Sequence, residues 1–188
     1  MGLWDVHHAL PGLDAIATRL TDVQDKYLFK AVSFVAPLGT WRRQKTEGVA
    51  YLNAPQVARR LHQKPKELGL QRLVAITSFP VCDEQTTDLY VWDEDADHRI
   101  TVVSTHGFLE QLKPPFDVEH MVADTVAFLI GGLEAHKKGP KDCPFYYNDE
   151  CAIESIAGQL KLCVSCRRRL QKDSGTMKTV EKILQAFS

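Results

Sequence analysis

The residues of this chain best suited to do chemistry are its cysteines. Four of the five lie within 24 residues, with the spacing Cys143-x7-Cys151-x11-Cys163-x2-Cys166. Zinc prefers four tetrahedral ligands with Zn–S distances of about 2.3 Å, and a C-x2-C pair supplies two thiolates from one tight turn. Four thiolates leave no position open for water or substrate, so such a site stabilises structure and does not hydrolyse. The spacing therefore predicts one structural Zn²⁺ ion bound by these four cysteines.

Other arrangements would fit the same four cysteines. They could be reduced thiols in a loop-rich core, two disulfides, or a redox pair at the C-x2-C, although disulfides are disfavoured in a cytoplasmic protein. A Zn(Cys)4 centre carries a charge of −2, which the nearby Lys161 and the basic run at 167–169 would offset. The fifth cysteine, Cys82, could be a nucleophile paired with a distant histidine, but a packed thiol is the simpler explanation.

The composition indicates a globular protein of one domain with a small appendage. The chain has 188 residues, of which 44% are hydrophobic and 25% charged, and its net charge is −1. No run reaches the roughly 18–20 apolar residues that cross a membrane, and residues 1–8 do not resemble a signal peptide, so we expect a cytoplasmic location. Residues 134–188 hold 10 Lys+Arg and 7 Asp+Glu, a weak basic bias compared with that of a dedicated nucleic-acid binder.

Hydrophobic patterns predict an α/β architecture. Runs of β-branched and aromatic residues predict strands at 27–36, 73–77, 89–92 and 100–104. Apolar residues at helical spacing predict helices that begin at Pro11, Asn53, Asp117 and about Thr176. The third of these, at 117–133, has a wide apolar face and should be central. We therefore expect a domain at 27–136, preceded by a partly helical segment at 1–26 and followed by a zinc-binding lobe at 137–188.

The order of these elements resembles that of an archaemetzincin-type zincin. In that family a strand near a VTD segment leads into a DLY segment, a hairpin, a VVS edge strand, the active-site helix and a cysteine cluster ending in C-x2-C. The matching pieces here lie at 74–78, 88–90, 102–104, 117–133 and 143–166, so the resemblance covers about residues 27–170. It implies a zincin-like mixed sheet with a central helix, plus a small C-terminal zinc lobe.

The catalytic motif of that family is missing. Zincin peptidases carry H-E-x-x-H on the central helix, where two histidines bind zinc and the glutamate activates its water. The helix here reads EHMVADTVAFLIGGLEAH. A divergent metal site is the alternative: His120 and Asp124 share a helix face at i and i+4, and His136 or His106 could join them. The simpler expectation is that His120 lies near the surface and Asp124 on the exposed stripe of the helix.

The leading functional expectation is therefore a catalytically inactive protein that binds a peptide or protein partner. In zincins an extended peptide pairs with an edge strand beside the central helix, and this β-augmentation needs no catalytic metal. The residues expected to form that edge are Ile100, Val102, Ser104 and His106. The alternatives are a metallopeptidase that uses the divergent site, and a zinc-dependent nucleic-acid-binding regulatory module that uses the basic run at 167–169.

Overall fold

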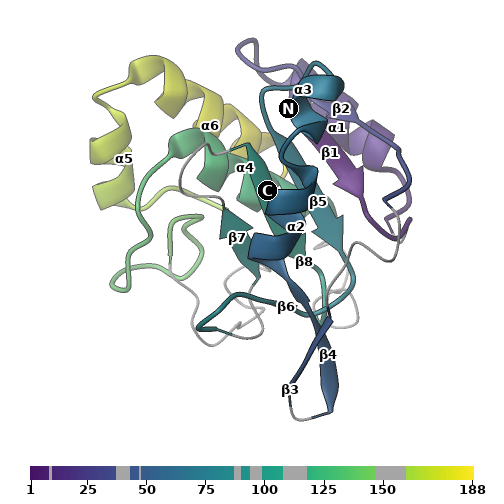
Figure 1. Cartoon of the computed structure of the whole chain (residues 1–188). Helices are drawn as coiled ribbons and strands as arrows, with labels where there is room; N and C mark the ends of the chain where they lie inside the picture. The colour runs from purple at the N-terminus through teal and green to yellow at the C-terminus, as the bar shows by residue number, and fades with distance from the viewer. Residues whose placement is uncertain are drawn as a thin grey trace. The chain divides into compact units, whose positions relative to one another are not determined.

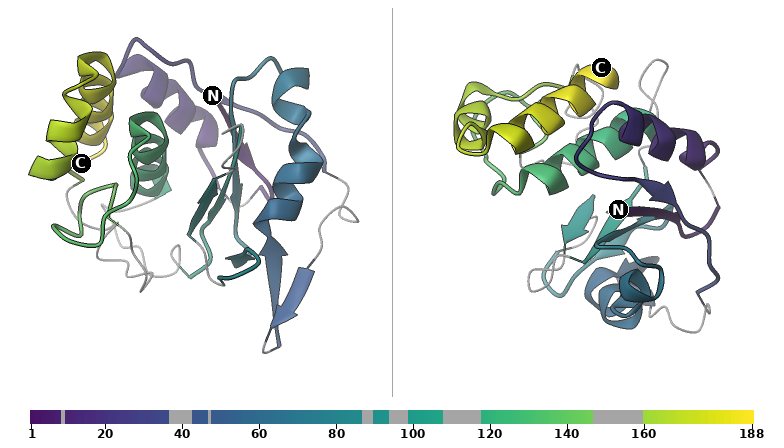
Figure 2. Two further views of the ribbon diagram at one scale, coloured as in Figure 1. Left: turned by 60° about the vertical axis from the view of Figure 1, so that its left-hand side comes forward. Right: turned by 90° about the horizontal axis from the view of Figure 1, so that it is seen from above.

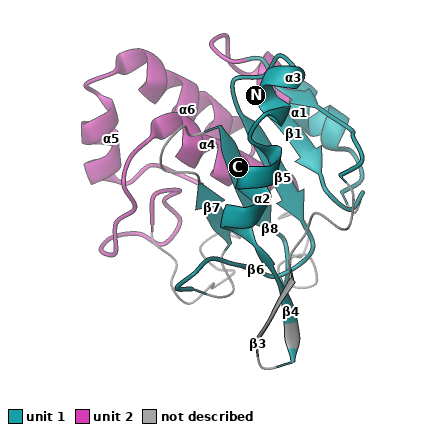
Figure 3. Ribbon diagram, viewed as in Figure 1, with its two compact units in different colours: residues 1–18, 28–107 teal, residues 19–27, 108–188 magenta. Residues whose placement is uncertain are grey.

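The computed structural model of the protein describes residues 1–8, 10–36, 43–46, 48–86, 90–93, 99–107, 118–146 and 160–188. The chain forms two compact units (Figure 3). Unit 1 comprises residues 1–18 and 28–107, and unit 2 comprises residues 19–27 and 108–188. These units differ from the expected ranges of 1–26, 27–136 and 137–188. The N-terminal segment contributes a strand to the sheet of unit 1, and the central helix packs with the C-terminal helix in unit 2.

Unit 1 is built on a five-stranded mixed sheet (Figure 1). Across the sheet the strands are β2 (Lys30–Ala31), β1 (Gly2–Asp5), β5 (Leu73–Thr77), β8 (Ile100–Ser104) and β7 (Val91–Asp93). All neighbouring strands are parallel except β7, which runs antiparallel to β8. Strands β5 and β8 are buried along their whole length, as their continuous apolar runs predict. The predicted mixed α/β architecture is confirmed.

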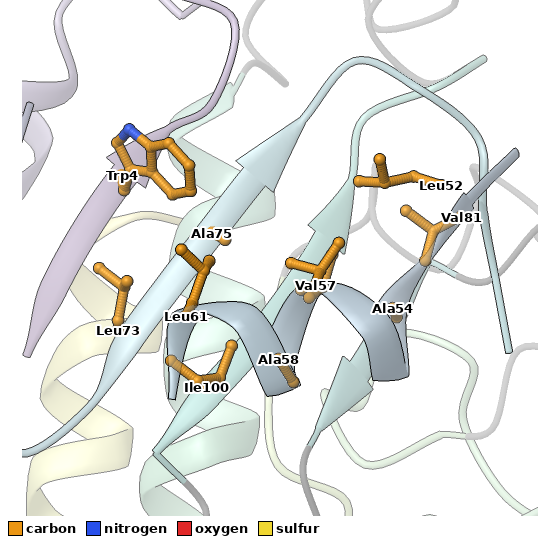
Figure 4. Close-up of a cluster of buried hydrophobic side chains, with 11 residues drawn as sticks. Trp4, Leu52, Ala54, Val57, Ala58, Leu61, Leu73, Ala75, Val81 and Ile100 are labelled. Carbon is orange, nitrogen blue, oxygen red and sulfur yellow. The ribbon is translucent and has the colours of Figure 1, made fainter. Parts of the chain in front are cut away.

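Helix α2 (Ala54–Leu61) packs its apolar face against this sheet. It begins after Asn53, whose side-chain oxygen accepts a hydrogen bond from the backbone N–H of Gln56 at 3.0 Å, so the predicted N-cap is confirmed. Figure 4 shows the buried Val57 and Leu61 side chains of the helix among those of the strands. The helix ends at Leu61, and the single turn α3 (Lys64–Glu67), which contains Pro65, follows.

Several strands were not predicted. Strand β1 lies inside the main sheet, whereas the expected strand at 27–36 is reduced to the two residues of β2. A second sheet has the order β3 (Arg43–Thr46), β4 (Val49–Asn53) and β6 (Val81–Cys82). Strand β4 runs directly into α2, and its parallel partner β6 follows β5 along the chain.

Unit 2 contains α4 (Val118–Gly131), α5 (Val164–Leu170) and α6 (Ser174–Ala186). Helices α4 and α6 pack side by side in both views of Figure 2. Arg19, in the helix α1 (Leu13–Asp22), links their ends. Its guanidinium donates hydrogen bonds to the Glu119 carboxylate and the Ala186 carbonyl, and its Cζ lies 4.4 Å from the centre of the Phe187 ring. Helix α4 is largely buried, as predicted. Among the described residues, no helix is long and apolar enough to cross a membrane.

Candidate metal centre

Four metal-ligating side chains come together in unit 2. One ligand atom from each of His136, Cys143, Cys163 and Cys166 lies within 4.8 Å of every other. Three of these are cysteines predicted to bind zinc, and the fourth is a histidine that the sequence analysis had placed in an alternative catalytic site. The remaining predicted ligand, Cys151, lies outside the described residues.

The C-x2-C pair is positioned by the start of helix α5. Cys163 is the N-cap residue of this helix, and its Sγ accepts a hydrogen bond from the backbone N–H of Cys166 at 3.4 Å. The Cys166 side chain lies on the first turn and is fully buried. A thiolate on Cys163 gains from the unpaired N–H groups at the helix start, so the turn brings the two sulfurs together and favours the charged form of Cys163.

His136 and Cys143 are brought together by a short bridge between two loop segments. The backbone N–H of His136 donates to the carbonyl of Phe145 at 2.7 Å, and the N–H of Tyr146 donates to the carbonyl of Cys143 at 2.8 Å. The Phe145 ring is fully buried against the end of α4, where a Cβ atom on Gly131 would lie 2.2 Å from its Cζ. A glycine at residue 131 is therefore needed for the metal-ligand loop to pack on α4.

The donor set fits a zinc ion. For Zn–S of about 2.3 Å and Zn–N of about 2.0–2.1 Å, tetrahedral angles place a sulfur and a nitrogen ligand about 3.6 Å apart. The observed distance from Cys163 Sγ to His136 Nε2 is 3.5 Å. Three thiolates and one imidazole form a common structural zinc set that leaves no open position. The four side chains can hold one zinc ion, and this arrangement stabilises structure and cannot activate a water molecule.

The thiols differ in how readily they ionise. Burial raises the pKa of Cys143 and Cys166 above the usual range of a thiol. Burial would also raise the pKa of Cys163, but hydrogen bonds from the backbone N–H and the side chain of Cys166 outweigh it and lower this pKa. Cys163 is thus the thiol whose charged form the protein favours most. Ionising the other two requires the charge of the metal itself.

The structure does not assemble the alternative site predicted at His120, Asp124 and His136. His136 lies with the cysteines, and in the described part of the chain no third metal-ligating side chain joins His120 and Asp124. The expectation that these two residues lie towards solvent is wrong, since they are only 7% and 8% exposed. Burial raises the pKa of Asp124 to about 7.

The predicted peptide-binding edge needs a correction. Ile100, Val102 and Ser104 belong to β8, which is not an edge strand because it pairs with β5 on one side and β7 on the other. The Ser104 hydroxyl donates to the Phe79 carbonyl at 2.9 Å and accepts from the N–H of His106, so it is occupied within unit 1. Strand β7 (Val91–Asp93), which overlaps the strand expected at 89–92, is the edge next to β8 instead. The order of strands depends on long-range pairing, which a local pattern does not reveal.

His136 is the member of the gathered group that the cysteine spacing did not predict. The signal was the spacing His136-x6-Cys143 ahead of the C-x2-C pair, but counting thiols alone gave four ligands without it. We expect His136→Ala to reduce the zinc content of the purified protein well below one per chain, because it removes one of the four gathered ligands. Metal analysis by mass spectrometry measures the zinc content. Zinc loss in Cys151→Ser but not in His136→Ala would instead support the predicted set of four cysteines.

No protein-family model matches the chain, and no curated protein matches it in sequence. Solved structures do match its fold. A zinc-dependent peptidase from Methanocorpusculum labreanum superimposes with a TM-score of 0.60 at 13% identity, over 90% of this chain and 98% of that chain. Archaemetzincin from Methanopyrus kandleri gives 0.61 at 18% identity, over 91% of this chain and 92% of that chain.

Archaemetzincin from Archaeoglobus fulgidus, in complex with malonate, gives a TM-score of 0.61 at 12% identity, over 90% of this chain and 99% of that chain. The similarity thus extends over nearly the full length of each compared structure. It confirms the predicted archaemetzincin-like fold, including the mixed sheet and the central helix.

Proposed function

We propose that this protein is a zinc-stabilised, non-catalytic relative of the archaemetzincin peptidases that binds extended peptides or protein segments. The observation that carries the proposal is the sequence of α4, VEHMVADTVAFLIG. A peptidase of the zincin type needs two histidines and a glutamate in H-E-x-x-H on one helix. Helix α4 has one histidine, His120, and the glutamate precedes it instead of following it. The fold supports descent from a peptidase, and the helix lacks the groups for hydrolysis.

The zinc ion of this proposal is structural. His136, Cys143, Cys163 and Cys166 would hold it, and its role would be to fix the loop after α4 to the start of α5. A metallopeptidase is the competing function, and metal content separates the two. The purified protein should contain one zinc per chain and should cleave neither casein nor a fluorogenic peptide library. A second, chelator-labile metal accompanied by peptide cleavage would establish the competing function.

Strand β7 offers the backbone needed to bind a peptide. The Ser104 N–H donates to the Tyr90 carbonyl at 2.8 Å. Because hydrogen-bonded pairs alternate along an antiparallel ladder, the backbone N–H and C=O of Trp92 also point towards β8. The N–H and C=O groups of Val91 then point away from the sheet. No other strand in the described part of the chain pairs with this side of β7. A bound peptide could form a sixth strand by accepting and donating hydrogen bonds at Val91.

A proline substitution tests this edge. Val91→Pro should weaken peptide binding about tenfold or more, because it removes the outward N–H and leaves the peptide carbonyl without its donor. The fold should survive, since proline is tolerated on an edge strand where the N–H faces solvent. The probe is a heptapeptide selected by phage display against the wild-type protein. Its dissociation constant can be measured by fluorescence anisotropy.

Strand β2 at the opposite edge supplies a matched control. The N–H groups of Lys30 and Val32 donate to β1, so that of Ala31 points outward. Ala31→Pro should leave the peptide affinity unchanged, and Val91→Thr should keep it near the wild-type value. Equal weakening by the two proline variants, or no selectable peptide at all, would show that β7 is not the binding edge.

A further inference from the structure

We propose that the outer face of helix α5, together with the adjoining metal-ligand loop, binds the phosphate backbone of a nucleic acid. This surface lies in unit 2 and is separate from the β7 edge in unit 1. Cys166 and Leu170 are the buried residues of α5 and define its inner side. Val164, Ser165 and Arg168 lie on the opposite side, where all three are exposed, and Lys172 follows Arg168 by one further turn.

Positive charge is concentrated around this helix. The described residues between 134 and 172 include eight basic side chains and two acidic ones. The basic residues are Lys137, Lys138, Lys141, Lys161, Arg167, Arg168, Arg169 and Lys172, and the acidic residues are Glu134 and Asp142. A zinc ion with three thiolates and a neutral imidazole has a charge of only −1. The metal centre would offset only one of these positive charges, although the whole segment 134–188, with 10 Lys+Arg and 7 Asp+Glu, has a weaker basic bias.

The ion pairs within unit 2 use only part of this charge. Arg167 pairs with Glu181 at 2.9 Å, Lys161 pairs with Asp142 at 3.1 Å, and Arg169 donates to the backbone carbonyl of Glu134. Arg168 and Lys172 form no ion pair with any described residue. The paired arginines flank Arg168 on the helix, so their contacts hold the helix in place while Arg168 remains available to a ligand.

The chemistry of the face favours a phosphate backbone over other partners. Arginine binds phosphate oxygens with two parallel hydrogen bonds, and the Ser165 hydroxyl can donate a further one. Binding to a lipid surface would need several exposed apolar side chains. Among the described residues of unit 2, Val164, at 68% exposure, is the one large hydrophobic residue that is exposed. A nucleic acid presents a regular line of charges along which several cations can act together.

The metal centre would make this surface rigid. Cys163 and Cys166 lie on the first turn of α5, and His136 and Cys143 hold the loop that carries Lys137, Lys138 and Lys141. Fixing both segments to one ion places their cations in advance, so less conformational entropy is lost when a ligand binds. Removal of zinc should therefore weaken nucleic-acid binding even though the metal itself does not contact the ligand.

The test measures binding of the full chain to a fluorescein-labelled 20-nucleotide single-stranded RNA and to a 20-base-pair DNA duplex. Binding should weaken steeply with salt, as expected for the release of counterions from phosphates. The variant R168E/K172E should bind at least about tenfold more weakly, with a salt dependence that is shallower by about 1–2 in the slope of log K against log salt concentration. Zinc content of one per chain confirms that the variant has kept its metal centre.

A charge-matched variant of unit 1 is the control. R59E/R60E replaces two exposed arginines of α2 and changes the net charge of the protein by the same amount as R168E/K172E. This variant should bind nucleic acid almost as well as the wild type. Equal weakening in both double variants would mean that net charge alone governs binding, which would overturn the assignment to α5. Absence of binding to both probes in low salt would also overturn it. So would tighter binding to phosphatidylserine vesicles than to either nucleic acid.

Discussion

Replacing Cys166 with serine should abolish zinc binding and lower the free energy of unfolding by several kcal/mol. Cys166 is fully buried and is one of four ligands within 4.8 Å of one another, so its loss leaves an incomplete metal site. Structural zinc contributes on the order of 10 kcal/mol of binding free energy in small domains, and part of this free energy stabilises the fold. Zinc content and thermal denaturation followed by circular dichroism measure the two effects.

Cys82→Ser is the matched control for this prediction. Cys82 is also a buried cysteine, but it lies on β6 in unit 1 and is not among the four gathered ligands. This variant should retain one zinc per chain. If Cys166→Ser does not fold, a chelator titration of the wild type provides the same information, because zinc removal should lower its melting temperature. A melting temperature unaffected by complete zinc removal would contradict a structural role for the ion.

Replacing Asp124 with asparagine should make the protein less sensitive to alkaline pH. Burial raises the pKa of Asp124 from 3.8 to about 7 in the folded protein. Between these two values the folded state keeps a proton that the unfolded state releases, so the stability of the wild type falls as pH rises. From pH 5 to pH 8 this loss is about 3 kcal/mol, and it is complete once the pH exceeds the folded-state pKa.

Asparagine has nearly the same shape and cannot ionise. Denaturant unfolding at pH 5 and pH 8 should therefore show Asp124→Asn gaining stability over the wild type at the higher pH. The contribution of Asp173 to stability should change with pH in the opposite direction, because hydrogen bonds from Thr176 lower the pKa of its carboxyl group. Asp173→Ala should be destabilising above the unfolded-state pKa, with less effect in acid. Parallel stability curves for Asp124→Asn and wild type would contradict the raised pKa.

The elements that the sequence predicted best were those with strong local signals. Helix α2 has an asparagine N-cap and a proline in its first turn, and α4 has apolar residues on every side. Strands β5 and β8 are continuous runs of apolar and β-branched residues. In each case the local preference agrees with the environment that the fold provides, so a short window of sequence is enough to identify the element.

The features that escaped prediction depend on contacts between distant parts of the chain. Strand β1 is only four residues long, and its place in the sheet depends on β5, some seventy residues later. The exposed side of β7 depends likewise on which strand pairs with β8. At the metal centre, the C-x2-C pair was recognisable because one turn positions both sulfurs. His136 reaches the same point through its bridge to Tyr146, and its spacing from Cys143 is too long for one local turn to predict this contact.

The central place of β1 also constrains the order in which the protein can fold. Its neighbours are β2 and β5, so β1 has both of its hydrogen-bonding partners only after Thr77 has been synthesised. Parallel pairing over such distances closes long loops before it gains any contacts, which makes folding slow. The nascent chain must therefore carry an unpaired strand containing Leu3 and Trp4 through much of its synthesis. Both side chains are almost completely buried in the finished fold, so an unpaired β1 exposes apolar surface that favours aggregation until β5 joins it.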